Sequence, residues 1–436
     1  LMLISSKIVN GINGTVKIPG DKSISHRSII IPSISKGVTQ ISNLLKSEDV
    51  FRTINAFQSM NVNIQVNKDD VIIEGKGLNS LIKSDKVIDL GNSGTSARLL
   101  TGLLSSQNFD STLVGDTSLS KRPMARITKP LELMGAKFDN NHNKLPLKIY
   151  GKKLHKIDYE LELPSAQVKS GLIFAALNTD GKSKIVEKKI TRNHTEIMLE
   201  SFEADIKINK VDSENHIFVN GKKELVPKNI SVPSDLSSAS FFIVAALINK
   251  NSFITMNNIN LNPTRDGILK ALNLMQANIQ INNKRTTNGE LIGDLEIKTS
   301  ELKGCELESD NARLMIDEYP ILSIAAAFAK SPSIFKGLGE LKVKESNRLE
   351  LIRHNLHNCG IFCKVSGEDL FIDPTKKISP KENQIKTDND HRIAMSFAIM
   401  GMKLGVDLYI ADSEFIKTSF PDFIVALNNV GGNLSE

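Results

Sequence analysis

Residues 19–27 form a short segment whose side chains could bind an anion. A proline and a glycine end a strand-like run, and Lys22, Ser23 and Arg27 follow ahead of an apolar run that is typical of a helix. The first backbone N–H groups of a helix lack partners within the helix and carry partial positive charge. Donor side chains beside such a terminus favour phosphate or carboxylate. For this segment alone, a capped helix with a solvated basic turn is an equally good interpretation.

Related turns recur along the chain at a regular spacing. Ser23, Thr95 and Gln167 occupy equivalent points about 72 residues apart. The series continues, with one longer step before its last two members, at Ala239, Ile321 and Ile393. Each turn opens with turn-forming or N-cap residues and runs into small and apolar ones. Helices that are apolar nearly all round are expected to be buried, so the sequence predicts six copies of one unit with a buried helix.

A second helical segment and strand-like alternation follow each buried helix. Outer helices are predicted over residues 124–134, 196–202, 266–275 and 348–356. Strands are predicted over 71–75, 136–138, 204–208, 277–281 and 369–372. We take the longer step as an insertion around 282–293. Because the buried helices are too apolar for a thin solenoid, we expect two globes of three modules each.

Composition narrows the classes of function. The length of 436 residues suggests two or three domains, and 40% hydrophobic with 24% charged residues is typical of a globular protein. A formal charge of +6 is mild and suits an enzyme for acidic substrates. Tryptophan is absent and aromatic residues make up only 5%, which disfavours a nucleic-acid binder. No apolar run is long enough to cross a membrane, and no signal peptide is evident.

The cysteines and histidines argue against a metal site. Cys305, Cys359 and Cys363 form no C-x-x-C pair, which disfavours a disulfide framework or zinc site and favours a reducing cytoplasm. Three histidines in the turn segments lack a second histidine at metal-ligand spacing and are more often structural: His26, His194 and His391.

Seven short motifs occur in order along nearly the whole chain. They are Gly20-Asp21-Lys22-Ser23, Gly91-Asn92-Ser93-Gly94-Thr95, Lys121-Arg122-Pro123-Met124, Ser165-Ala166-Gln167-Val168-Lys169, Asp317-Glu318-Tyr319-Pro320, Lys344-Glu345-Ser346-Asn347-Arg348 and Asp390-His391-Arg392. Together they resemble the 5-enolpyruvylshikimate-3-phosphate synthase family, also called 3-phosphoshikimate 1-carboxyvinyltransferases. The second bacterial subclass is suggested by the serine-alanine-glutamine form of the third turn, Arg192-Asn193-His194-Thr195-Glu196 and Asn262-Pro263-Thr264-Arg265.

This resemblance implies an α/β (α+β) fold of two domains. Each domain would hold three βαβαββ repeats, with buried parallel helices that point at the cleft between the domains. A discontinuous domain with both chain ends would comprise residues 1–19 and 233–436, and a central domain would comprise 20–232. Both crossovers lie at a proline, near Pro19 and Pro233.

The implied reaction moves the enolpyruvyl group of phosphoenolpyruvate to the 5-hydroxyl of shikimate 3-phosphate and releases phosphate, without metal or cofactor. Both substrates carry phosphate and carboxylate groups, for which arginine is suited because it stays charged and binds in a bidentate fork. By resemblance, the shikimate 3-phosphate contacts are Lys22, Ser23, Arg27, Ser165, Ala166, Gln167, Arg192, Asp317 and Lys344. The phosphoenolpyruvate contacts are Lys22, Gly94, Arg122, Gln167, Arg348 and Arg392.

The implied mechanism is addition followed by elimination through a tetrahedral intermediate. Asp317 resembles the base that takes the hydroxyl proton, and Glu345 resembles the acid that protonates the methylene carbon. Lys22 either assists proton transfer or only stabilises charge. The neighbouring cations would lower the pKa of Glu345 and burial would raise it, and the sequence leaves the balance open. Lys417 is a weaker candidate for proton transfer.

Each of these residues also has a plainer interpretation when it is taken singly. Arg122 or Arg392 alone is more often part of a surface salt bridge than a ligand contact. Asp317 alone would be a helix N-cap, because it precedes an apolar helix. The joint placement of these residues at the module turns is what favours the functional interpretation.

The resemblance also bears on partners and on rival functions. Glyphosate should compete with phosphoenolpyruvate, and Gly94 predicts at most partial tolerance because tolerant members of the subclass often have alanine there. We expect a cytoplasmic monomer that binds neither nucleic acid nor membrane. UDP-N-acetylglucosamine enolpyruvyl transferase is the nearest rival, but it carries a reactive cysteine near the place of Arg122, and the first cysteine here is Cys305. An RNA-end-processing protein built on related modules is a second rival.

Overall fold

The computed structural model describes all 436 residues, apart from the side chains of Asn140 and Lys377. The chain divides into two compact units. Unit 1 comprises residues 1–19, 234–286 and 291–436, and unit 2 comprises residues 20–233 and 287–290. Each unit has its own hydrophobic core, built from residues of that unit.

Unit 2 contains three four-stranded sheets among the described residues. Its first module is α1 (Lys22–Ser33), β3 (Lys36–Ser42), α2 (Glu48–Ser59), β4 (Asn63–Val66) and β5 (Asp70–Lys76), completed by β14 (Ile230–Ser231). The second is β6 (Ile88–Asp89), α3 (Gly94–Ser105), β7 (Ser111–Val114), α4 (Ala125–Leu133), β8 (Lys137–Asn141) and β9 (Lys144–Tyr150). The third is β10 (Asp158–Glu160), α5 (Ala166–Ala176), β11 (Lys182–Glu187), α6 (His194–Ser201), β12 (Ile206–Val211) and β13 (Glu214–Asn220).

Unit 1 repeats the same plan in its described residues. Its first module is β2 (Asn13–Thr15), α7 (Leu236–Ile248), β15 (Phe253–Asn260), α8 (Gly267–Leu274), β16 (Asn278–Thr287) and β17 (Glu290–Lys298). The next is β18 (Glu306–Leu307), α9 (Ala312–Met315), α10 (Tyr319–Ala327), β19 (Ser333–Phe335), α11 (Arg348–Asn358), β20 (Ile361–Ser366) and β21 (Asp369–Lys377). The last is β22 (Gln384–Ile385), α12 (His391–Gly401), β23 (Leu408–Ala411), α13 (Phe423–Asn429) and β24 (Leu434–Ser435), completed by β1 (Met2–Ser5).

Each sheet combines one parallel strand pair at its edge with antiparallel strand pairs. In the second module of unit 2, for example, β6 runs parallel to β7 with Ile88 opposite Leu113, and β7 and β8 both pair antiparallel with β9. A parallel pair needs a crossover connection, and in four of the modules the first helix supplies it. The parallel pairs β3 with β14 and β2 with β15 are instead joined through segments of other modules. The order of elements is βαβαββ, which confirms the predicted α/β (α+β) fold with three repeats in each unit.

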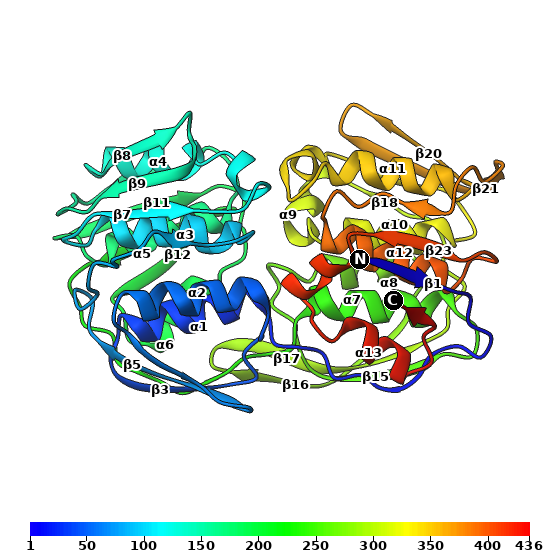
Figure 1. The fold of residues 1–436 in the computed structure, drawn as a ribbon, viewed down its shortest axis with the longest axis horizontal. Coiled ribbons are helices and arrows are strands. Elements are labelled where there is room, and N and C mark those ends of the chain that lie inside the picture. Colours follow the sequence, from blue (N-terminus) through cyan, green and yellow to red (C-terminus); the bar gives the residue numbers. More distant parts are fainter. The chain divides into compact units, whose positions relative to one another are not determined.

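The crossover helices form the cores of the units. All thirteen residues of α7 and all nine of α10 are buried, as their apolar sequences predict. Figure 1 shows α3 beside α5 in unit 2 and α10 beside α12 in unit 1. The first pair packs closely at glycines, because a Cβ at Gly102 would lie 1.9 Å from the carbonyl oxygen of Gly171. No described helix combines the length and apolar character that crossing a bilayer requires.

The predicted elements agree closely with the observed ones. The outer helices α4, α8 and α11 differ from their predicted ranges by at most two residues at either end, and α6 begins two residues early, at His194. The predicted insertion corresponds to a long hairpin, since β16 and β17 have ten and nine residues.

The tip of this hairpin departs from the predicted domain limits. Residues 287–290 belong to unit 2, because Asn288 bonds to the segment around Ser231 and Glu290 contacts His194. The predicted domains, 1–19 with 233–436 and 20–232, stay a prediction.

Candidate active site

The predicted site residues fall into two groups, one in each unit. Unit 1 holds Asp317, Lys344, Glu345, Arg348 and Arg392. Unit 2 holds Lys22, Ser23, Arg27, Gly94, Arg122, Ser165, Ala166, Gln167 and Arg192. All of them lie in or within a few residues of the turns that begin helices of the modules.

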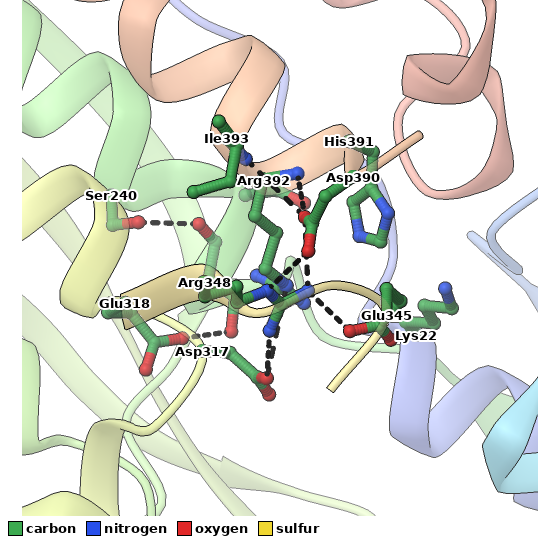
Figure 2. A network of polar contacts seen from close by, with 12 residues as sticks. Lys22, Ser240, Asp317, Glu318, Glu345, Arg348, Asp390, His391, Arg392 and Ile393 are labelled. Carbon is green, nitrogen blue, oxygen red and sulfur yellow. Dashed lines mark hydrogen bonds and ion pairs between the residues drawn. The ribbon is translucent and has the colours of Figure 1, made fainter. Parts of the chain in front are cut away.

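A buried guanidinium is the centre of the group in unit 1. Arg348 is the first residue of α11, and its Nε donates to Asp390 Oδ2 at 2.8 Å. Its Nη1 donates to Asp317 Oδ1 at 3.3 Å, and its Nη2 forms an ion pair with Glu345 Oε2 at 2.6 Å. Figure 2 shows the three carboxylates around this guanidinium. The resemblance predicted Arg348 as a phosphoenolpyruvate contact; here it positions carboxylates, and direct contact with substrate stays a prediction.

The three carboxylates differ in exposure. Arg348 and Asp390 are fully buried, whereas the side chains of Asp317 and Glu345 are 17% and 19% exposed. Burial opposes the charged form of Arg348, but the carboxylates of Asp390, Glu345 and Asp317 outweigh it and raise its pKa. The guanidinium therefore stays charged, and it holds the two predicted proton-transfer groups where solvent or a ligand can reach them.

Arg392 and Lys344 complete the group in unit 1. Arg392 Nε lies 4.0 Å from Asp317 Oδ1, so the second predicted arginine also faces this carboxylate. Lys344 is partly exposed, just ahead of Glu345. Asp317 is not a helix N-cap: Glu318 precedes α10, and Asp317 bonds to Arg348 instead. Lys417 is exposed in the short 3-10 helix Ser413–Thr418, and no described contact supports a role for it.

The caps of the crossover helices separate the predicted anion sites into two kinds. Helices α1, α7 and α12 begin after an aspartate whose carboxylate accepts backbone N–H groups: Asp21, Asp235 and Asp390. Helices α3 and α5 begin after neutral caps, Ser93 and Ser165. An aspartate cap places the chain's own anion at the positive helix end, whereas a serine cap leaves that end able to stabilise a ligand anion. We therefore expect α3 and α5 to be the strongest anion sites among these termini.

Residues of unit 2 surround the start of α5. Ser165 accepts the backbone N–H of Val168 at 3.3 Å, and Ala166 begins the helix. Gln167 Nε2 donates to Thr95 Oγ1 at 3.1 Å, which joins α5 to the start of α3. Lys169, two residues after Gln167, is fully buried and forms ion pairs with Glu187 and Glu196.

Gly94 lies against two arginines. Arg98 Nη1 donates to the carbonyl oxygen of Gly94 at 3.0 Å. A Cβ at position 94 would lie 2.5 Å from Arg122 Nη1 and 2.7 Å from Arg98 Nη1. The absence of a side chain thus lets two guanidinium groups approach the backbone, and Arg98 is a cation that the motifs had not indicated.

The start of α1 carries two cations in different surroundings. Lys22 forms an ion pair with Asp49, a residue of α2. Arg27 is 2% exposed, and its guanidinium donates to Thr195 Oγ1 at 2.6 Å, Ser23 O at 2.8 Å and Ser170 Oγ at 2.9 Å. None of these partners is ionised, and among the described residues Arg27 forms no salt bridge.

The unpaired charge of Arg27 is an unusual feature. Burial, together with the charge of Arg192, lowers its pKa to about 10, although Glu196 and Asp21 act in the opposite direction. Buried charges are normally paired. Arg27 therefore differs from Arg348, whose charge is neutralised by carboxylates of the chain, and it is suited to a ligand that brings a negative charge.

His26 should make the free energy of unfolding depend on pH. It is fully buried between Lys22 and Arg27, with Nδ1 2.8 Å from Thr53 Oγ1. Burial, then the charges of Lys22 and Arg27, lower its pKa well below 6.5. As the pH falls below 6.5 the unfolded chain takes up a proton there and the folded chain does not. The free energy of unfolding should then fall by about 1.4 kcal/mol per pH unit from this group.

Urea unfolding between about pH 7.5 and 5.5 checks this expectation. His26→Gln removes the titrating group and should flatten the pH dependence. The control is His155→Gln, at an exposed position of unit 2, which should leave the dependence unchanged. Equal pH slopes for the wild type and His26→Gln would contradict it.

The sequence analysis did not predict three buried networks of polar contacts. Lys169 pairs with Glu196 at 2.7 Å and Glu187 at 3.0 Å, all within unit 2. In unit 1, Arg265 donates to Ser237 Oγ at 2.6 Å and Asp235 Oδ1 at 3.1 Å. His194 contacts Glu290. Lys169, His194, Glu196 and Arg265 all lie in the motifs that resemble the family, but their partners are distant in sequence.

No described cluster suggests a metal ion. Among the described residues, no group of three or more His, Cys, Asp and Glu side chains is arranged to hold one. Asp317, Glu345 and Asp390 gather around a guanidinium instead.

The comparisons with known proteins agree with the motifs. The family model for EPSP synthase (3-phosphoshikimate 1-carboxyvinyltransferase) matches residues 7–427. The 3-phosphoshikimate 1-carboxyvinyltransferase of Vesicomyosocius okutanii subsp. Calyptogena okutanii is 45% identical over 427 residues, which cover 98% of this chain and 97% of the relative. That of Thermoanaerobacter pseudethanolicus is 41% identical over 415 residues, 94% and 96% of the two chains.

Solved structures give the same result. EPSP synthase from Acinetobacter baumannii matches with a TM-score of 0.87 and 40% identity, over 100% of both chains. The enolpyruvyl transferase NikO from Streptomyces tendae, at 13% identity, has a TM-score of 0.79 over 100% of this chain and 98% of its own, and supports the fold alone. The resemblance of the seven motifs is confirmed: the chain belongs to the EPSP synthase (3-phosphoshikimate 1-carboxyvinyltransferase) family and is a transferase.

Proposed function

We propose that the chain transfers the enolpyruvyl group of phosphoenolpyruvate to the 5-hydroxyl of shikimate 3-phosphate. The products are phosphate and 5-enolpyruvylshikimate 3-phosphate, an intermediate of chorismate and aromatic amino acid biosynthesis. Membership of the family supports this activity, and the carboxylates of unit 1 supply groups for its proton transfers.

The observation that carries the mechanism is the shared attachment of two accessible carboxylates to one buried arginine. Asp317 and Glu345 both contact Arg348. In the addition step, Asp317 takes the proton of the 5-hydroxyl, whose oxygen bonds to C2 of phosphoenolpyruvate, while Glu345 gives a proton to C3. In the elimination step, the bond between C2 and the phosphate oxygen breaks, Glu345 takes a proton back from C3, and the proton held by Asp317 passes to the departing phosphate. A common guanidinium stabilises whichever carboxylate is ionised at each step.

Most of the binding groups for shikimate 3-phosphate in this proposal belong to unit 2, and Asp317 and Lys344 belong to unit 1. Arg27 carries an unpaired buried charge, and the neutral start of α5 presents backbone N–H groups at Ser165, Ala166 and Gln167. The further contacts proposed are Lys22, Ser23, Arg192, Asp317 and Lys344. Phosphoenolpyruvate would contact Lys22, Gly94, Arg122, Gln167, Arg348 and Arg392.

A phosphate-release assay with the purified protein tests the function. Release from phosphoenolpyruvate should require shikimate 3-phosphate, and a mass spectrum should show the enolpyruvyl product. UDP-N-acetylglucosamine or RNA in its place should give no turnover. Turnover with the UDP sugar and none with shikimate 3-phosphate would overturn the proposal in favour of the sister enzyme.

Gly94→Ala is expected to weaken phosphoenolpyruvate and glyphosate together. The added methyl group would lie 2.5 Å from Arg122 Nη1, so this guanidinium must move away from the anion site. We expect KM for phosphoenolpyruvate and the inhibition constant of glyphosate each to rise about tenfold or more, the factor that corresponds to about 1.4 kcal/mol. Steady-state kinetics at saturating shikimate 3-phosphate measure both.

Gly405→Ala provides a matched control for that substitution. Gly405 is exposed, and apart from its chain neighbours no described atom lies within 4 Å of the place that a Cβ would take there, so neither constant should change. A Gly94→Ala enzyme with both constants at wild-type values would separate Gly94 from the phosphoenolpyruvate site.

The proposal also covers the cellular compartment and the oligomeric state of the protein. We infer a cytoplasmic enzyme from the three free cysteines, Cys305, Cys359 and Cys363, which suit a reducing compartment. A monomer is proposed for the assembly, and light scattering of the purified protein measures it.

A further inference from the structure

The tip of the β16–β17 hairpin belongs to unit 2 and is bonded there at two points. Asn288 Oδ1 accepts the backbone N–H of Ser231 at 2.9 Å, and Asn288 Nδ2 donates to the carbonyl oxygen of Asn229 at 3.0 Å. These bonds hold the tip beside strand β14. The second point of attachment is Glu290, which is 2% exposed.

Glu290 contacts the first residue of α6. Its Oε1 lies 2.6 Å from His194 Nδ1, and both side chains are buried. An ionised carboxylate only accepts, so Nδ1 of His194 is the donor of this bond when Glu290 is ionised. This bond fixes the orientation of the imidazole ring at the point where α6 begins.

The first turn of α6 is also where the unpaired Arg27 is held. Thr195 Oγ1 accepts from Arg27 Nε at 2.6 Å and lies 2.7 Å from Ser170 Oγ, which itself accepts from Arg27 Nη2. The next residue, Glu196, pairs with Lys169 of α5. A shift of this turn would therefore move the hydroxyl groups that set the direction of the Arg27 guanidinium.

We infer that Glu290 is a positioning residue for the shikimate 3-phosphate subsite, acting through His194 and the first turn of α6 on Arg27. The inference rests on the proposed function, because it takes shikimate 3-phosphate as the ligand of Arg27. The carboxylate of Glu290 also belongs to the charges that favour the protonated form of Arg27. The hairpin tip would thus contribute to substrate affinity as well as to the structure.

Three substitutions at Glu290 separate a hydrogen bond from a charge. Glu290→Gln keeps an acceptor oxygen at the same reach but removes the charge. Glu290→Asp keeps the charge but is one methylene too short to reach His194. Glu290→Ala removes both. Asn288→Ala is the matched control, since it removes the bonds of the same hairpin tip to residues 229 and 231 and leaves the bond between Glu290 and His194 in place.

Calorimetric titration with shikimate 3-phosphate alone measures the effect on the full-length protein. We expect the dissociation constant to rise about tenfold for Glu290→Ala and Glu290→Asp, and to stay within about threefold of wild type for Glu290→Gln and Asn288→Ala. KM for phosphoenolpyruvate should stay unchanged in all four variants. If Glu290→Ala fails to fold, the contrast between Asp and Gln decides the question.

Two results would overturn the inference. One is wild-type affinity in both Glu290→Asp and Glu290→Ala; the other is equal weakening in Asn288→Ala, which would reduce Glu290 to a structural anchor. A wild-type protein that does not bind shikimate 3-phosphate at all would instead overturn the proposed function, so the two failures are distinguishable.

Discussion

Arg348→Met is expected to destabilise unit 1 by about 3–5 kcal/mol and to remove measurable turnover, because it leaves three carboxylates without their shared counter-charge. Asp390 is fully buried and would keep only neutral donors, the hydroxyl of Ser346 and the backbone N–H groups at the start of α12. Asp317 and Glu345 would repel each other and lose the guanidinium that orients them. Removing one partner from a buried ion pair costs more than the pair contributes, since the remaining charge stays desolvated.

Urea unfolding and phosphate release measure the two effects separately. Arg348→Lys restores one charge but not the planar fork that reaches three carboxylates, so it should regain part of the stability and little of the turnover. Arg265→Met is the control in the same unit, because Arg265 is also buried and bonded to an aspartate cap, Asp235, but lies outside the predicted site. It should lower stability without a comparable loss of kcat in the folded fraction. Turnover within about tenfold of wild type in Arg348→Lys would contradict this role.

The fold could be predicted from the sequence because local patterns and global repetition agree. Helices such as α7 are apolar on every side, and only burial between sheets accommodates them. The predicted ends of the outer helices lie within two residues of the observed ends, because turn residues mark where these helices begin and end. The tip of the β16–β17 hairpin was missed, because nothing local in residues 287–290 indicates that Glu290 contacts His194, which is distant in sequence.

The contacts between the predicted site residues could not be predicted from the sequence. Motifs indicated Arg348, but its four polar contacts with Asp317, Glu345 and Asp390 depend on three separate turns of the fold. The same limit applies to Lys22, whose partner Asp49 lies in no motif. The arginines in the motifs indicated that the site binds anions. Only the structure shows that carboxylates of the chain neutralise Arg348 and that Arg27 has only uncharged partners.

Glu345→Gln is expected to lower kcat by about 10²–10⁴-fold while leaving the fold and the affinity for shikimate 3-phosphate near wild type. The amide keeps an oxygen toward Arg348 but cannot give a proton to the methylene carbon. Asp317→Asn should cost a similar factor, since an amide cannot take the proton of the 5-hydroxyl. Both side chains are the accessible members of a cluster whose other members are buried, so substitution should disturb chemistry more than packing.

A closely matched control lies on helix α11 itself. Glu350 pairs with Arg353 at the spacing by which Glu345 pairs with Arg348, but it is exposed and outside the predicted site. Glu350→Gln should therefore leave kcat within about twofold, because an exposed ion pair contributes little. Single-turnover kinetics with phosphoenolpyruvate and shikimate 3-phosphate should show that the chemical step itself is slowed in Glu345→Gln. A kcat within about tenfold of wild type would show that another group protonates the methylene carbon, and the assignment of Glu345 would fall.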